Sequence, residues 1–429
     1  MQTAKYPEKG LEWTSIMERP IWNRQELSLQ VQPIINEVFN KGDEAVFHYT
    51  ALFDGVELED LNVYEDEVEV AIQQVSQELR DAIKSAYDNI YKFHASQQEE
   101  IKKIETNTGV ECWRKSVPIE SVGIYIPGGS APLFSTVLML AIPAQIAGCR
   151  QVILCSPPNE NGEIHPAILY AAELCGVHEI YKVGGAQAIA AMAYGTESIP
   201  KVHKIFGPGN QYVTIAKQLV NVSGTAIDIP AGPSEVLIIG DDEARPDFIA
   251  ADLLAQAEHG EDSQVIFVTT SEAHLNMVHF EIDKQLVHLP RKAIAEKALK
   301  NSWMVLLNDL EDAITFSNQY APEHLILQTR NAEDLAEKVI NAGSVFIGHY
   351  SPESAGDYAS GTNHTLPTNG YAAAYSGVSL DSFVKKITFQ IISKEGLEKL
   401  ANTIEIMAAA EGLDAHKNAV SIRIRIDEG

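Results

Sequence analysis

The sequence predicts an α/β fold with two α/β halves and additional helical segments near both ends of the chain. Two observations support this prediction. Short apolar runs alternate with helical stretches from about residue 121 to residue 347, which is typical of sheets covered by helices. The chain also has 429 residues, which is more than a single hydrophobic core usually contains.

A helical region is expected from residue 24 to about residue 102. Apolar side chains recur at steps of three and four, first at Leu27, Val31 and Val38 and later at Ile83 and Ile90. Residues at this spacing lie on one face of a helix. The region therefore predicts amphipathic helices with one buried face each.

Short apolar runs after Ser121 predict β-strands in two groups. The first group is 122–126, 152–155, 180–183, 204–206 and 226–229, and the second is 236–239, 265–268, 305–307, 325–327 and 345–347. Helical stretches separate several of these runs. Each group is therefore expected to form a sheet of its own.

The last element expected is a helix over about 394–413. Leu397, Leu400, Ile404 and Met407 lie on one of its faces. Such a face packs either on a partner subunit or on its own chain, and the pattern leaves both open.

The composition narrows the class of protein. The formal net charge of -27 argues against binding to nucleic acid or to an anionic membrane, because phosphate recognition needs clustered Lys and Arg. Neither an N-terminal apolar leader nor a run of roughly eighteen apolar residues is present. We expect a cytoplasmic globular protein.

The four cysteines are too few and too irregularly spaced for a disulfide framework or a CxxC zinc site. They are Cys112, Cys149, Cys155 and Cys175, and we expect reduced thiols. Cys155 ends an apolar run before Ser-Pro-Pro. That position suits either a nucleophile or a small buried filler.

Adjacent acid and imidazole groups follow Pro322 at the start of an expected strand. Glu323 and His324 offer two proton-transfer sites with different ordinary pKa values. Neighbouring residues in an extended chain point to opposite faces, so the two need not act on the same atom. Structural and catalytic interpretations of this pair both remain open.

Candidate metal ligands occur in two other places. A helix expected over 246–258 would place Gln256 and His259 on one face near its C-terminal end. Asp357 and His364 lie in a loop rich in Gly, Ser and Asn, 354–364. Oxygen and nitrogen ligands of this kind suit zinc, although an N-cap or turn role is also typical of such an aspartate.

Four glycine-bearing loops lie between expected strands and helices, at 127–130, 184–187, 207–210 and 231–234. Glycine lets a backbone approach a phosphate or a flat ligand closely. None fits the dinucleotide fingerprint, because Gly207-Pro-Gly209 is followed by Asn-Gln-Tyr, and a Walker A sequence is also absent. The spacing alone favours turns and leaves a nucleotide cleft open.

Taken together, these segments closely resemble the histidinol dehydrogenase family. The matching blocks are 123–136, 183–188, 206–210, 230–235, 256–259, 321–324, 354–364 and 415–418. So many blocks in the right order cover nearly the whole chain. The resemblance implies oxidation of L-histidinol to L-histidine through L-histidinal, the last steps of histidine biosynthesis, with two NAD molecules and a bound zinc ion.

The resemblance also implies roles for individual residues in a homodimer with shared active sites. One Zn2+ per subunit would be held by Gln256, His259, Asp357 and His416 of the partner subunit. Glu323 and His324 match the acid–base pair. Substrate contacts are implied at Ser234, Gln256, His259, His324, Asp357, His364, Glu411 and His416, and NAD contacts at Tyr125, Gln187 and Asn210.

The family architecture implies two incomplete Rossmann-like domains, similar to those of aldehyde dehydrogenases, with small helical terminal segments. The expected boundaries are 1–23 for an N-terminal segment, 24–124 with 236–380 for a first domain, 125–235 for a second, and 381–429 for a C-terminal segment. We expect the first domain to carry the metal and acid–base residues and the second to contact NAD. The helical C-terminal segment would reach the partner subunit.

The mechanistic hypothesis assigns zinc the role of a template that orients histidinol. His324 would take the hydroxyl proton, and Glu323 would activate the water that attacks the aldehyde. Three alternatives are kept. They are a cysteine-dependent aldehyde dehydrogenase using Cys155 or Cys112, a zinc-dependent hydrolase, and an NAD-binding sensor without catalysis.

Overall fold

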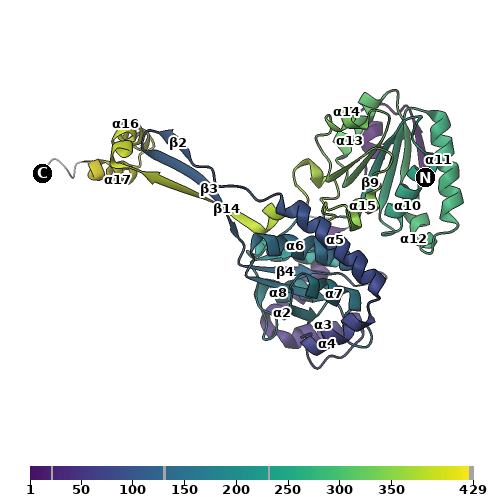
Figure 1. The fold of residues 1–429 in the computed structure, drawn as a ribbon, viewed down its shortest axis with the longest axis horizontal. Coiled ribbons are helices and arrows are strands. Elements are labelled where there is room, and N and C mark those ends of the chain that lie inside the picture. Colours follow the sequence, from purple (N-terminus) through teal and green to yellow (C-terminus); the bar gives the residue numbers. More distant parts are fainter. Residues whose placement is uncertain (21–22, 129–131, 230–231, 425–429) are drawn as a thin grey trace.

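The computed structural model describes residues 1–20, 23–128, 132–229 and 232–424. The chain forms two α/β bodies and a narrow arm that extends away from them (Figure 1). Each body is built on its own parallel sheet. The arm carries the C-terminal helices at its far end.

The first body contains a six-stranded parallel sheet. Its strand order is β1 (Gln2–Lys5), β11 (Trp303–Leu306), β10 (Gln264–Thr269), β9 (Glu235–Gly240), β12 (His324–Gln328) and β13 (Ser344–Ile347). Alternate residues of a strand point to opposite faces. Val236 and Ile238 of β9 accordingly lie in one hydrophobic core, and Leu237 and Ile239 lie in the other.

Helices cover both faces of this sheet. One face packs against α10 (Pro246–Ala257), α11 (Glu272–Leu286) and α12 (Lys292–Lys300), and the other against α1 (Leu11–Ile16), α13 (Leu310–Tyr320) and α14 (Ala332–Ala336). A short helix, α15 (Glu353–Tyr358), follows β13. Because both faces are covered, the central strands β9, β10 and β12 are buried along their whole length.

The second body contains a five-stranded parallel sheet. Its order is β6 (Glu179–Lys182), β5 (Gln151–Ser156), β4 (Ser121–Tyr125), β7 (Lys204–Phe206) and β8 (Ala226–Ile227). One face carries α2 (Arg24–Lys41), α3 (Asp43–Asp54), α8 (Gly185–Tyr194) and α9 (Gln211–Val222). The other carries α4 (Glu65–Gln74), α5 (Gln77–Ala95), α6 (Phe134–Ala147) and α7 (Pro166–Leu174).

The packing of the N-terminal helices differs from the expected domain boundaries. The sequence predicts that 24–124 joins 236–380, but Leu27 and Val31 share a core with the strand residue Ile153, and Ile83 shares one with Val122. These helices therefore belong to the second body. Apolar spacing shows that a helix has a buried face but does not show which sheet covers that face.

The expected N-terminal segment, 1–23, is also part of a larger unit. Strand β1 pairs with β11, and the ring of Trp13 packs edge to face against Phe316 at 5.2 Å between centroids. Trp13 and Ile16 are buried in a core of the first body. The first 16 residues thus complete the edge of the first sheet.

The arm is an antiparallel sheet with two helices beyond it. Its strands are β14 (Val384–Ile392), β3 (Val110–Pro118) and β2 (Ile104–Asn107), and its helices are α16 (Lys394–Ala410) and α17 (Asp414–Ile424). The short 3-10 turns Tyr371–Ala373 and Leu380–Phe383 lead into it. The predicted helix over about 394–413 is confirmed, but the segment 381–429 is not wholly helical, because β14 pairs with β3 across a long stretch of chain.

The ten predicted strands are all present, with ends that shift by no more than two residues. Four strands were not predicted: β1, β2, β3 and β14. In the part of the chain that the structure describes, no helix is long and apolar enough to cross a membrane.

Candidate active site

Glu323 and His324, the pair expected to carry out acid–base chemistry, lie at the amino end of β12, at the amino edge of the first sheet. Helix α13 ends at Tyr320, Ala321 takes the left-handed conformation with φ 51°, and the chain enters β12 through Pro322. Only 6% of Glu323 and 4% of His324 is exposed. The two side chains are thus held inside the protein by a sharp turn in the backbone.

The backbone of Glu235, at the start of β9, contacts both members of the pair. Its N–H donates to Glu323 Oε2 at 2.9 Å, and its carbonyl accepts from His324 Nδ1 at 3.3 Å. A carbonyl can only accept, so Nδ1 carries the proton. His324 Nε2 has no hydrogen-bond partner among the described residues. Nε2 is therefore the nitrogen that lacks a proton whenever the ring is neutral.

Three carboxylates surround the His324 ring. Glu323 Oε2 and Glu353 Oε1 lie 3.7 Å and 3.9 Å from Nδ1, and Asp357 Oδ1 lies 3.6 Å from Nε2. Burial raises the pKa of Glu323 to about 8. Burial by itself would lower the pKa of His324, but Glu353, Glu323 and Asp357 outweigh it and raise that pKa to about 10. Three acidic groups are thus gathered around one imidazole.

A candidate metal cluster adjoins the pair. One ligand atom from each of His259, Glu353 and Asp357 lies within 4.8 Å of the other two. His259 follows the end of α10, whereas Glu353 and Asp357 are one turn apart on α15. An imidazole nitrogen with two carboxylate oxygens is a donor set that zinc accepts. The residues present therefore fit a zinc ion.

Gln256, in the last turn of α10, lies beside this cluster. Its neighbours orient the amide so that the nitrogen donates to Glu353 and the oxygen accepts from the Glu235 N–H at 2.8 Å. The amide oxygen retains a second lone pair. Of the predicted ligands, Gln256, His259 and Asp357 thus come together in one chain.

Glu353 is a site residue that the sequence reasoning missed. Its side chain is only 1% exposed, and burial raises its pKa well above the ordinary value. The sequence offers one signal for Glu353. It follows Pro352, just as Glu323 follows Pro322 next to His324. Glu353 lies one residue before the loop 354–364 that holds the other candidate ligands.

His364 connects the two bodies. Its Nδ1 contacts the backbone carbonyl of Asp357 at 2.9 Å, and its Nε2 contacts Thr136 Oγ1 of α6 at 3.2 Å. Ser234 immediately precedes β9, and its carbonyl accepts from the Gln264 N–H at 3.2 Å. Both predicted substrate contacts are therefore next to segments that carry the cluster or the pair.

Glu411 and His416 lie elsewhere. Glu411 caps the end of α16, His416 is in α17, and both are exposed. These helices are at the tip of the arm, far from α15 and β9 of the same chain (Figure 1). A single chain does not bring His416 to the cluster.

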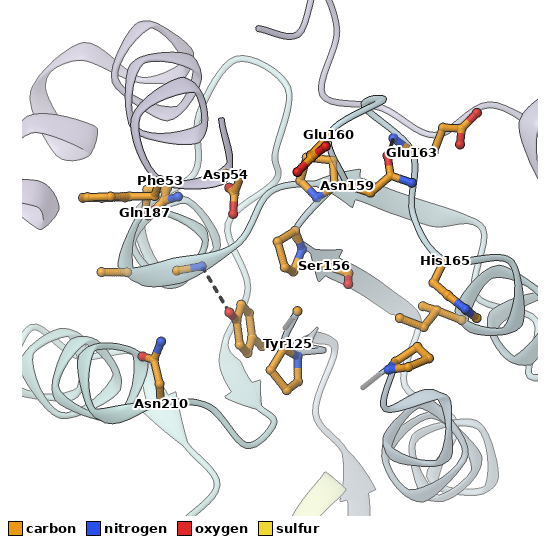
Figure 2. Close-up of a pocket in the computed structure, with 18 of the residues that line it drawn as sticks. Phe53, Asp54, Tyr125, Ser156, Asn159, Glu160, Glu163, His165, Gln187 and Asn210 are labelled. Atoms are coloured by element: carbon orange, nitrogen blue, oxygen red, sulfur yellow. Dashed lines mark hydrogen bonds between the residues drawn. The ribbon is translucent and has the colours of Figure 1, made fainter. Parts of the chain in front are cut away.

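A cavity of about 1160 Å³ opens at the carboxyl edge of the second sheet (Figure 2). Tyr125, Gln187 and Asn210 all line it. The Tyr125 hydroxyl accepts from the Gly185 N–H at 3.1 Å, at the start of α8. The carboxyl edge is where parallel sheets usually bind ligands.

Two polar side chains of the cavity have capacity for a ligand. Gln187 is 0% exposed, and neither atom of its amide has a hydrogen-bond partner among the described residues. Asn210 caps α9, since its Oδ1 accepts from the N–H groups of Tyr212 and Val213 at 3.0 Å and 3.1 Å. That cap leaves the Asn210 amide nitrogen as a donor.

The glycine loops shape this edge. Gly207 has φ 127°, and a Cβ there would lie 2.1 Å from the Tyr125 carbonyl oxygen, so a side chain is excluded. The loops at 127–130 and 231–234 are described only in part, because 129–131 and 230–231 lie outside the described residues. The loops at 184–187 and 207–210 both border the cavity.

Comparisons with known proteins identify close relatives over the whole chain. A family model described as histidinol dehydrogenase matches residues 17–424. Histidinol dehydrogenase of Bacteroides thetaiotaomicron is 59% identical over 424 residues, covering 99% of both chains. That of Aliivibrio fischeri is 54% identical over 427 residues, covering 97% of this chain and 96% of the relative. The crystal structure of histidinol dehydrogenase from Elizabethkingia anophelis superposes with a TM-score of 0.98 at 56% identity, covering 100% of this chain and 99% of that one.

Proposed function

The chain belongs to the histidinol dehydrogenase family and is an oxidoreductase, and from this premise we propose that it oxidises L-histidinol to L-histidine through L-histidinal in histidine biosynthesis. Two NAD molecules would accept the four electrons. The observation that carries the proposal is the buried pair Glu323 and His324 beside the cluster His259, Glu353 and Asp357. Acid–base groups next to a metal-binding set suit the oxidation of an alcohol.

We propose that one Zn2+ per subunit binds Gln256, His259, Asp357 and His416 of the partner subunit. Three of these residues lie together in one chain, and three acidic side chains surround His324 beside them. A dication at this place would favour the ionised forms of these acids. When bound, Zn2+ would hold the imidazole and amino nitrogens of the substrate and so orient its carbinol carbon. Glu353 would hold the Gln256 amide in place.

His324 is proposed to take the proton of the substrate hydroxyl at Nε2. The Glu235 carbonyl holds Nδ1 as the protonated nitrogen, so Nε2 of the neutral ring has a free lone pair. Carboxylates raise the His324 pKa, and positive charge beside Asp357 would offset them and lower this pKa toward neutrality. Loss of that proton leaves the alkoxide from which hydride can depart.

Glu323 is proposed to serve the second oxidation. It would take a proton from the water that attacks the aldehyde, giving the anionic form of the hydrate, whose carbon-bound hydrogen can leave as hydride and so yield the carboxylic acid. Bound NAD would supply the hydride acceptor for each of the two oxidations. Burial separates Glu323 from bulk water, so a proton bound to its carboxyl group does not exchange freely with the solvent.

NAD is proposed to bind in the 1160 Å³ cavity of the second body. The unpaired amide of Gln187 and the free amide nitrogen of Asn210 are suited to a polar ligand. The contact between His364 and Thr136 joins this body to the cluster. Nicotinamide bound at that side would approach the acid–base pair.

A homodimer with shared active sites is proposed from the arm. Large apolar side chains are exposed along β14 and on the two arm helices, including Ile387, Phe389, Ile391, Ile406 and Met407. An exposed apolar surface of this kind usually contacts another chain. A partner arm would bring its His416 and Glu411 to the cluster that lacks them.

The cysteine-dependent alternative has no support in the surroundings of the two thiols. Cys155 is fully buried in β5, where burial raises the pKa of its thiol far above the ordinary value. Cys112 lies in β3 of the arm. Replacing both with Ala should leave NADH formation in place.

The proposal is tested by counting NADH formed per L-histidinol consumed by zinc-loaded protein, with a chelator-treated control. Two NADH per substrate, lost with the metal, are expected. One NADH would mean that the aldehyde escapes and that Glu323 does not have the proposed role. No NADH would contradict the proposal and favour a hydrolase, which turns over without NAD, or a binding protein.

A further inference from the structure

We propose that Arg19 is a positioning residue for the acid–base pair: it fixes the two backbone segments that hold Glu323 and His324. This inference rests on the proposed role of that pair in alcohol oxidation. Arg19 lies in the short segment that follows α1, far in sequence from both partners. It acts through Glu235 and Tyr320.

The first step concerns the backbone of Glu235. Its N–H is shared between Glu323 Oε2 at 2.9 Å and the Gln256 amide oxygen at 2.8 Å, and its carbonyl accepts from His324 Nδ1 at 3.3 Å. One residue therefore sets the orientation of the Glu323 carboxylate and the tautomer of the neutral His324 ring. A shift of its backbone would change both at once.

The second step concerns what holds Glu235. The Arg19 guanidinium donates two hydrogen bonds to the Glu235 carboxylate, from Nε at 2.5 Å and from Nη2 at 3.0 Å. The side chain of Arg19 is 14% exposed and that of Glu235 is 2% exposed. The Tyr320 hydroxyl lies 3.2 Å from Glu235 Oε2 and 2.7 Å from Gln264 Oε1, and its single proton is donated to one of these oxygens at a time. A two-pronged ion pair fixes direction as well as distance.

The third step concerns the segment before Glu323. Arg19 Nη2 also donates to the Tyr320 carbonyl at 2.6 Å, and its guanidinium stacks on the Tyr320 ring at 3.8 Å. The next residue, Ala321, has the left-handed φ of 51°, which a residue with a side chain seldom adopts. Arg19 thus holds the last residue of α13 immediately before the turn that delivers Glu323 and His324.

Arg19→Met tests the inference, because methionine keeps much of the aliphatic part of the side chain and removes the guanidinium group. We expect kcat for histidinol to fall about tenfold or more, while KM for histidinol and NAD changes less than about twofold. Arg19→Lys should recover part of kcat, since it keeps one charge but not the two-pronged geometry. Loss of kcat and KM together, without rescue by Lys, would indicate a purely structural role and overturn the inference.

Lys182→Met is the matched control. Lys182 forms an ion pair with Glu67, and its side chain is 12% exposed. This ion pair joins β6 to α4 in the second body, away from Glu323 and His324. Its loss should lower stability without changing kcat by more than about twofold. If Arg19→Met has no larger effect on kcat than this control, the inference is wrong.

Two further measurements keep the test decisive. If Arg19→Met does not fold, the isosteric Glu235→Gln should show the same selective loss of kcat. A crystal structure of Arg19→Lys should show a changed distance between the Glu235 carbonyl and His324 Nδ1, and an unchanged distance overturns the inference. Absence of NADH with the unmodified protein would instead refute the proposed function, and the crystal structure would still test the positioning.

Discussion

Glu323 has the surroundings of a base that becomes effective only above neutral pH. Burial raises its pKa to about 8, and the Glu235 N–H partly offsets that effect by binding the charged form. The ionised fraction of Glu323 therefore grows as the pH rises through about 8. Because only the carboxylate can take a proton from water, oxidation of supplied histidinal should accelerate as the pH rises, over a range that bound Zn2+ would move below about 8.

Glu323→Gln should remove this rise and slow the histidinal step by about a hundredfold or more, with a smaller effect on the alcohol step. The measurement is NADH formation from histidinol and from histidinal across pH 6.5 to 9.5. Glu272→Gln, which removes an exposed carboxylate paired with Lys5, is the control and should change neither profile. Equal losses in both steps would show that the two oxidations do not divide between Glu323 and His324 as proposed.

Asp252 is a buried carboxyl whose neutral form the fold favours. Burial raises its pKa from 3.8 to about 7, and its Oδ2 accepts a hydrogen bond from the Gln328 amide nitrogen at 2.9 Å. The folded pKa lies above the unfolded one, so the stabilising contribution is complete below pH 3.8 and is lost as the pH rises to about 7. Asp252→Asn, which is always neutral, should therefore unfold with a free energy greater by about 2 kcal/mol at pH 8.

Urea unfolding at pH 5 and pH 8 measures this difference between Asp252→Asn and the unmodified protein. The difference should be larger at pH 8, since the native carboxyl is then ionised in both states. The new amide can also donate to Gln328 Oε1, which has no partner among the described residues. A difference that is the same at both pH values would show that the charge of Asp252 does not limit stability.

At the scale of elements, Asn210 at the start of helix α9 would combine a capping role with the proposed contact to NAD. Asn210 Oδ1 caps the helix, and its amide nitrogen is left to face the cavity. Asn210→Asp should keep the cap, because aspartate is an equally good N-cap and suits the helix dipole. It replaces the free donor with an acceptor, so KM for NAD should rise about tenfold without loss of stability.

Asn210→Ala separates the two roles. It loses the cap as well as the donor, so its free energy of unfolding should fall by about 1 kcal/mol in addition to the rise in KM. Thermal unfolding and NAD titrations of both variants provide the comparison. An unchanged KM in Asn210→Asp would restrict Asn210 to its capping role.

The sequence predicts elements better than their assembly. The strand from 236 to 239 is apolar throughout because both of its faces are covered, and that signal is local. By contrast, β14 has exposed residues along most of its length and is defined by pairing with β3, which lies far away in sequence. Helices α2 and α5 show their buried faces in the sequence but not the sheet that they cover.

The site follows the same rule. Gln256, His259, Glu323 and Asp357 are recognisable by residue type and spacing, and the structure brings them together. Glu235 could not be recognised in this way, because its contacts with the acid–base pair are made by its backbone N–H and carbonyl. Backbone contacts leave no signature in side-chain chemistry, so only the fold reveals them.

At the scale of the whole molecule, the two bodies use opposite edges of their sheets. Glu323 and His324 are at the amino edge of one sheet, whereas Tyr125 and Gln187 are at the carboxyl edge of the other. His364 bridges the bodies by contacting Thr136. Substrate and cofactor would thus be held by separate bodies, and hydride transfer would depend on how these bodies dock.

In the proposed dimer, the arm of each chain completes the active site of the other chain. Mixing two inactive variants tests this arrangement. His416→Ala removes the proposed ligand from the arm, and His324→Ala removes the proposed base from the body, so each homodimer should be inactive. In a mixed dimer, the intact body of one chain meets the intact arm of the other, while the second site carries both defects. An equal mixture refolded together gives about half mixed dimers, each with one working site, so about a quarter of the full activity should return.

The position of α17 explains why this result would be decisive. Within one chain His416 lies at the tip of the arm, remote from His259 and Asp357 (Figure 1). A site built from a single chain would need the arm to fold back, and two such chains could not repair each other's defects. Mixtures that stay inactive after subunit exchange, verified by separating dimers of differently tagged chains, would therefore place His416 in its own chain's site or outside the site altogether.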